Sequence, residues 1–172
     1  MELDRVAGLE DVQAGEGVDE KTLYDPHTWL DPQKAAEEAQ IIADRLSDLD
    51  SDHRDIYQAN ARKFQEEAKE LTERYQKIFD KVPNKTFVTQ HTAFSYLAKR
   101  FGLTQLGIAG ISPEQEPSPR QLTEIEDFVK EHQVKTIFVE SNASSKADPA
   151  NQLSYLENLE KNLAVLAKDL KG

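Results

Sequence analysis

The stretch that decides the fold is residues 86–102, TFVTQHTAFSYLAKRFG, because it holds two periodicities in succession. Thr86 to Thr89 is a short run of apolar and β-branched side chains, which is typical of a strand. The apolar residues after this run have helical spacing: Phe94, Leu97, Ala98 and Phe101. Gly102 then offers a C-cap for the helix. A strand that leads directly into a helix predicts one repeating unit of an α/β sheet.

The same alternation continues toward the C-terminus. Residues 105–108 form a weaker strand pattern, and Ser118 with Pro119 and Gln121 gives the start of a helix. Residues 134–139, VKTIFV, are the clearest strand, and their apolar character predicts a central position in the sheet. A last helix is indicated by leucines at steps of three and four: Leu153, Leu156, Leu159, Leu163, Leu166 and Leu170. The alternation predicts a parallel sheet with flanking helices, hence the α/β class.

Two helices are predicted on the N-terminal side of this sheet. Residues 32–46 have helical spacing, with Asp31 and Pro32 suited to the N-cap and first turn. A longer amphipathic helix over 54–82 follows and ends at Pro83. The acidic, glycine-containing residues up to about 23 are typical of a loop.

Composition excludes several classes of function. The chain has 172 residues, enough for one domain or for one lobe with a piece of another. Its 21 Lys and Arg against 32 Asp and Glu give a net charge of −11, which repels phosphate backbones, so nucleic acid is not an expected partner. The absence of cysteine leaves imidazole and carboxylate as metal ligands. No run approaches the roughly 20 apolar residues that span a bilayer, and Met1 opens no signal peptide.

Two histidines are the candidate metal ligands. His91 follows the strand at 86–89, and ligands bind at the carboxyl ends of strands in α/β sheets. His27 lies between Asp25-Pro26 and Asp31-Pro32, and the prolines stiffen the backbone on both sides. The alternatives are a histidine at a helix N-terminus that satisfies local backbone and an exposed loop histidine.

The other candidates have more ordinary interpretations. His53 falls in a solvated helix–helix turn and His132 in a last helical turn, so both are interpreted as structural. Glu140, directly after the strand at 134–139, suits a metal ligand, an acceptor for an imidazole N–H or a helix cap, and the last two are favoured. Tyr24 and Trp29 are interpreted as packing residues, and residues 114–117 as a loop that lines the cleft or is solvated.

Four segments together resemble the metal-receptor class of ABC-transporter substrate-binding proteins, most closely the zinc-binding lipoproteins of the adhesion-competence type. The segments are residues 25–29 (DPHTW), 86–103, 107–119 with SPEQEPSP, and 138–141. The resemblance implies two α/β lobes joined by a long backbone helix, with a metal held between them by His27 and His91. It implies a non-enzymatic protein that captures Zn²⁺ outside the cell, anchored by lipid in the parent protein, and delivers it to a membrane ABC permease.

The resemblance also implies a division of the chain and two departures from the pattern. Residues 1–53 correspond to a remnant of the first lobe, 54–82 to the linking helix and 83–172 to an incomplete second lobe. The family's early histidine with its His-rich loop, and the acidic ligand expected after Lys146, have no counterpart in this chain. The chain is therefore expected to be truncated in the first lobe and internally after Lys146.

The choice of metal follows from the ligand types. Imidazoles suit zinc, whereas Mn²⁺ prefers carboxylate oxygen, and manganese-specific relatives tend to carry a carboxylate where His91 stands. Zn²⁺ is the prediction and Mn²⁺ the lesser candidate. A zinc hydrolase that uses His27, His91 and Glu140 as general base is the alternative, although no HExxH motif is present. A helical interaction or adhesion module is a third interpretation.

Overall fold

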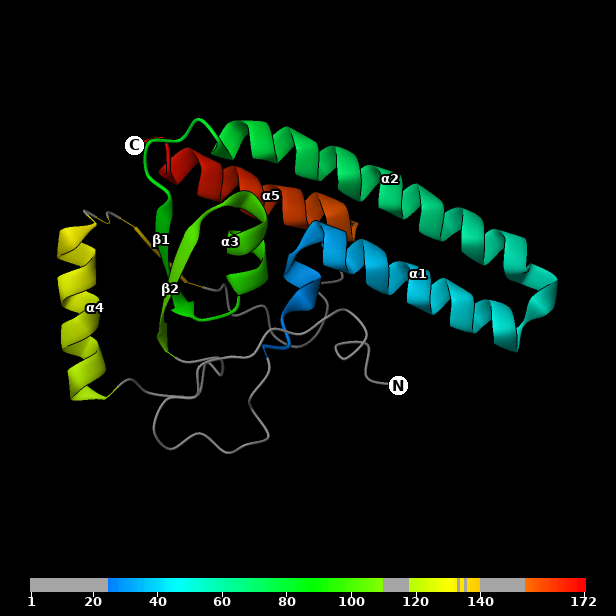
Figure 1. Cartoon of the computed structure of the whole chain (residues 1–172), viewed down its shortest axis with the longest axis horizontal. Helices are drawn as coiled ribbons and strands as arrows, with labels where there is room; N and C mark the ends of the chain where they lie inside the picture. The colour runs from blue at the N-terminus through cyan, green and yellow to red at the C-terminus, as the bar shows by residue number, and fades with distance from the viewer. Residues whose placement is uncertain (1–24, 110–117, 133, 135, 140–153) are drawn as a thin grey trace. The chain divides into compact units, whose positions relative to one another are not determined.

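The computed structural model describes residues 25–109, 118–132, 134, 136–139 and 154–172 (Figure 1). The chain divides into two compact units, Met1–Gln76 and Lys77–Gly172, each with its own internal packing. The division into 1–53, 54–82 and 83–172 stays a prediction. None of the helices in the described residues is long and apolar enough to cross a bilayer.

The first unit is built on two helices, as the sequence predicts. A 3₁₀ turn η2 (Thr28–Leu30) leads into α1 (Pro32–Leu49), and a second turn η3 (Ser51–His53) leads into α2 (Arg54–Phe79), whose end belongs to the second unit. The Asp31 carboxylate accepts a hydrogen bond from the Gln33 backbone N–H at 2.9 Å, and Pro32 occupies the first turn. The predicted N-cap of α1 is therefore confirmed.

The helices α1 and α2 run side by side in opposite directions (Figure 1). The buried residues of α1 are all small: Pro32, Ala35, Ala36, Ala43 and Ser47. On α2, the small residues Ala61 and Ala68 are buried as well. The larger residues whose spacing predicted α1 lie instead on its exposed face: Ile42, Leu46 and Leu49.

A network of amides joins α1 to α2 and makes the pair sensitive to acid. The Gln58 and Gln40 side-chain amides each donate to the Asp44 carboxylate at 2.9 Å. These hydrogen bonds, that of Gln58 first, hold the pKa of Asp44 below its usual 3.8. Because the folded-state pKa is lowered, the carboxylate stabilises the fold above pH 3.8, and that contribution is lost as the pH falls through the folded-state pKa.

We therefore expect Asp44→Asn to lower the thermal midpoint at pH 7, and the difference from wild type to shrink as the pH falls below 3.8. Thermal melts followed by circular dichroism over this range measure the effect. Glu37→Gln, on the exposed surface of the same helix, is the matched control and should follow the wild-type curve. A difference for Asp44→Asn that stays constant with pH would contradict the interpretation.

The second unit is an α/β sheet with helices, as the class predicted. Its elements are β1 (Thr86–His91), α3 (Ser95–Phe101), β2 (Thr104–Ala109), α4 (Pro119–Glu131), β3 (Ile137–Phe138) and α5 (Tyr155–Asp169). The described strands lie in the order β2-β1-β3, and β1 is parallel to both neighbours. Gly102 has φ 64° at the end of α3, and Ser154 forms a capping box with Glu157 at the start of α5.

Two details of the predicted sheet were wrong. The most apolar run, 134–139, yields only the two-residue strand β3 at an edge of the described sheet, and β1 is the central strand. The apolar residues of this run pack on one side of the strand without placing it at the centre of the sheet. The centroids of the Phe138 and Phe87 rings lie 6.3 Å apart in an edge-to-face arrangement, while Val139 is 71% exposed. The strand β1 also runs beyond the predicted residues 86–89, so that His91, expected to follow the strand, is its last residue and pairs with Ala109.

The core of the second unit gathers aromatic and leucine side chains. The rings of Phe79, at the end of α2, and Phe101, in α3, lie 5.0 Å apart between centroids, and neither is more than 1% exposed. Val88 of β1 and Leu163 of α5 are completely buried. The predicted apolar face of the last helix is thus confirmed over its described residues.

Candidate metal-binding residues

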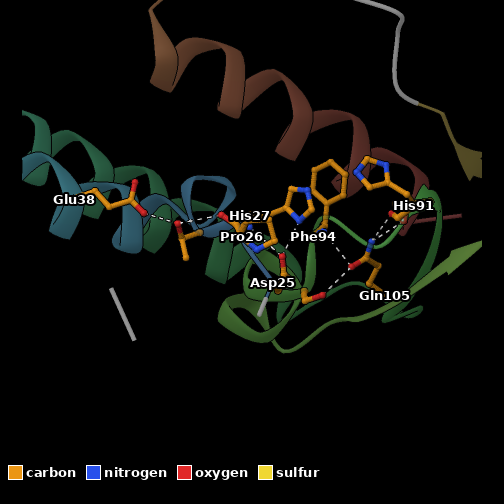
Figure 2. Close-up of polar contacts among 10 residues, drawn as sticks. Asp25, Pro26, His27, Glu38, His91, Phe94 and Gln105 are labelled. Carbon is orange, nitrogen blue, oxygen red and sulfur yellow. Dashed lines mark hydrogen bonds and ion pairs between the residues drawn. The ribbon is translucent and has the colours of Figure 1, made fainter. Parts of the chain in front are cut away.

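His27 is held by a carboxylate two residues before it (Figure 2). The Asp25 Oδ1 atom accepts a hydrogen bond from the His27 backbone N–H at 3.0 Å and lies 2.7 Å from the ring atom Nδ1. Asp25 is only 3% exposed, and the His27 side chain is 13% exposed. One carboxylate oxygen therefore fixes both the backbone and the ring of this histidine.

This contact decides which ring nitrogen of His27 presents a lone pair. An ionised carboxylate accepts hydrogen bonds and donates none, so Nδ1 carries the proton. In the neutral ring Nε2 is then the nitrogen with the lone pair. Histidines that bind metals are commonly held in this way, with the other ring N–H donated to a carboxylate.

The loop that carries His27 is attached to α1. Thr28 is 1% exposed; its backbone N–H donates to the Pro26 carbonyl at 2.8 Å, and its hydroxyl donates to the Glu38 carboxylate (Figure 2). Further along, the Gln33 amide donates to the Thr72 hydroxyl of α2 at 2.9 Å. The loop around His27 is thus attached to α1, and the first turn of α1 is in turn attached to α2.

His91 is 5% exposed, and its backbone carbonyl is held in part by a side chain of the neighbouring strand β2. Its carbonyl oxygen accepts hydrogen bonds from the Thr89 hydroxyl at 2.7 Å, the Ala93 N–H at 3.1 Å and the Gln105 amide at 3.2 Å. The interpretation of His91 as a histidine within a helix start is wrong, because α3 begins only at Ser95. The prediction that it lies at the carboxyl end of a strand is confirmed.

The other histidines lie on the surface. His53 is exposed, with Nδ1 at 2.9 Å from the Asp50 carboxylate. His132 is also exposed, and its ring centroid lies 4.2 Å from that of Phe128. The ring of Trp29, 45% exposed, lies 5.4 Å from that of His27. Tyr24, residues 114–117 and Glu140 lie outside the described residues.

No group of three or more His, Cys, Asp or Glu side chains that could hold a metal ion gathers within the described residues. His27 belongs to the first unit and His91 to the second. Each histidine is instead held in place by its own polar partner, Asp25 or Gln105. The assignment of both as ligands stays a prediction.

Comparison with known proteins shows the family of the chain. Residues 2–166 match the family ZnuA, described as zinc-uptake complex component A, periplasmic. The chain belongs to the ZnuA family. Among relatives, it is 43% identical over 122 residues to the high-affinity zinc uptake system protein ZnuA of Bacillus subtilis, covering 71% of this chain and 38% of that protein. It is 39% identical over 131 residues to the zinc-binding lipoprotein AdcA of Streptococcus pneumoniae, covering 76% and 26%.

A solved structure of similar fold is a Zn(II)-bound mutant variant of Streptococcus pneumoniae AdcAII. It matches with a TM-score of 0.89 and 59% identity, covering 98% of this chain and 69% of that one. The chain thus spans 38% or less of the length of the two curated ZnuA-family relatives described above. Their activity is carried to this chain as a proposal.

Two residues around the candidate ligands were missed by the sequence reasoning. Asp25 was interpreted as part of a turn, although an aspartate two residues before a histidine is well placed to accept from both its N–H groups. Gln105 gave no signal beyond being a polar residue within a strand pattern. Its partners come from a different strand and could not be inferred without the register.

Proposed function

We propose that this chain captures Zn²⁺ as the substrate of an ABC uptake system, with His27 and His91 as zinc ligands. The observation that carries the proposal is the contact of His27 Nδ1 with the Asp25 carboxylate at 2.7 Å, which supports Nε2 as the ligand atom. Membership of a zinc-uptake family supports the same cargo. The protein delivers the ion to a membrane permease and works outside the cytoplasmic membrane, held there by a lipid anchor.

The ligand types support zinc over manganese. Imidazole nitrogen suits Zn²⁺, whereas Mn²⁺ prefers sites dominated by carboxylate oxygen. Asp25 already bonds to an imidazole and so acts on the ion through His27. Water or a further protein group would complete the tetrahedral shell that zinc favours.

The hydrolase alternative is not favoured. The matched family consists of components of zinc uptake, which bind and deliver their ion. A hydrolase also needs a general base beside the metal-bound water, and the sequence contains no HExxH motif to supply one.

Calorimetric titration with Zn²⁺ tests the proposal on the full chain. Asp25→Ala should weaken binding by about 10–100-fold, because the ring of His27 loses the partner that fixes its tautomer. Asp25→Asn should lose less, since an amide oxygen still accepts from Nδ1. Asp52→Ala, which removes an exposed carboxylate from η3, is the control and should bind like wild type.

Two results would contradict the proposal. The first is a wild-type chain that binds no Zn²⁺. The second is an Asp25→Ala variant that is folded by circular dichroism and binds Zn²⁺ with wild-type affinity.

A further inference from the structure

The amide of Gln105 bridges both sides of the turn that follows His91 (Figure 2). Its Nε2 atom donates to the Thr89 hydroxyl at 2.6 Å and to the His91 carbonyl at 3.2 Å. Its Oε1 atom accepts from the Phe94 backbone N–H at 3.1 Å and from the Ser95 hydroxyl at 3.5 Å. One side chain on β2 therefore spans from the end of β1 to the start of α3.

The chemistry of the partners fixes the orientation of this amide. A backbone N–H can only donate, so the atom facing Phe94 must be Oε1. A backbone carbonyl can only accept, so the atom facing His91 must be Nε2. The Thr89 hydroxyl fits the same pattern, because it donates to the His91 carbonyl and accepts from Nε2. Every donor in the cluster meets an acceptor in a single arrangement.

The register of the sheet allows the amide to reach this turn. Gln105 is the partner of Phe87, and the next residue on the same face of β2, Gly107, is the partner of Thr89. Gly107 has no side chain, so nothing on that strand competes for the position opposite Thr89. The long Gln105 side chain can lie along β2 toward His91.

We infer that Gln105 is a positioning residue for zinc binding, acting through the backbone of His91; this inference rests on the proposed function. With the carbonyl of His91 and the N–H of Phe94 tied to one amide, the backbone from 91 to 94 is fixed. The imidazole then keeps only its own side-chain torsions. A ligand that is fixed before the ion arrives loses less conformational entropy on binding.

The test compares Zn²⁺ titrations and Co²⁺ absorption spectra of the wild-type chain and its variants. Gln105→Met keeps the length of the side chain and removes its four polar contacts. We expect its Kd for Zn²⁺ to rise about 10-fold, the lower end of the range for groups behind a metal ligand. The visible bands of bound Co²⁺, which report the geometry of the ligands, should change in intensity or position.

Two further variants provide a second test of the same hydrogen bonds and a control. Thr89→Val removes the hydroxyl that donates to His91 and accepts from Gln105 while preserving shape, and it should change the Kd and the spectrum in the same direction. Thr89→Val also tests the inference if Gln105→Met does not fold. Gln90→Met alters an exposed glutamine directly before His91 and should leave both readouts unchanged.

The outcomes separate this inference from the proposed function. Absence of Zn²⁺ binding by the wild-type chain would overturn the proposed function and the inference with it. Zn²⁺ binding by wild type, with unchanged Kd and Co²⁺ spectrum in folded Gln105→Met and Thr89→Val, would overturn the inference alone. A lower thermal midpoint without a change in either metal readout would show that Gln105 serves only stability.

Discussion

Replacing His27 by alanine is expected to weaken Zn²⁺ binding by more than the roughly 10–100-fold that loss of an outer partner costs. The variant loses the nitrogen that we propose as ligand, and water is a weaker donor to zinc than imidazole. His91→Ala should have an effect of the same order. Calorimetric titration with Zn²⁺ at fixed pH measures both.

Two exposed histidines provide matched controls for these variants. His53, in the turn η3, and His132, directly after α4, are exposed and lie outside the candidate ligand set. His53→Ala and His132→Ala should both bind Zn²⁺ like wild type. Equal losses for all four variants would point to non-specific binding by surface histidines. Wild-type affinity in the folded His27→Ala, His91→Ala double variant would contradict the assignment of ligands.

Replacing Phe101 by alanine is expected to lower the free energy of unfolding by about 3–5 kcal/mol. The ring is 1% exposed and meets the Phe79 ring at 5.0 Å, so its removal leaves a cavity between α3 and the end of α2. Equilibrium unfolding in urea, followed by circular dichroism, measures the loss.

The control for this substitution is Leu122→Ala on α4. Leu122 is 46% exposed, and surface substitutions of this kind are usually within about 0.5 kcal/mol of wild type. Similar losses for Phe101→Ala and Leu122→Ala would contradict the placement of Phe101 in the core. Leu122→Ala also checks that the urea method resolves the difference.

Helices with clear caps were predictable from the sequence. Asp31 and Pro32 start α1, and Gly102 follows the end of α3, because each signal acts within a turn of the element that it bounds. The helix predicted over 54–82 ends earlier, at Phe79. The alternation of strands and helices likewise gave the parallel sheet. These features depend on local spacing, which one sequence contains.

Features that depend on partners far along the chain were not predictable. Among the described strands, β1 rather than residues 134–139 lies at the centre, and no local pattern contains that order. The buried residues of α1 are small, and Ile42 and Leu46 face solvent despite their helical spacing. Periodicity predicts that a helix forms without showing which of its faces another helix covers.

The residues of the candidate site likewise divide into those that local sequence predicts and those that depend on distant partners. His27 and His91 were found from turn residues and from the end of a strand. Asp25 is local and could have been found from its spacing. Gln105 could not, because its contact with His91 depends on the register between β1 and β2. The two histidines are thus fixed by different means, one by a carboxylate on its ring and the other by an amide on its backbone.

Zinc K-edge X-ray absorption on the zinc-loaded chain tests the central claim most directly. The account predicts imidazole scattering with Zn–N distances of about 2.0–2.1 Å, and one imidazole fewer in each of His27→Ala and His91→Ala. A zinc shell made only of oxygen donors, or imidazole scattering unchanged in both variants, would contradict it.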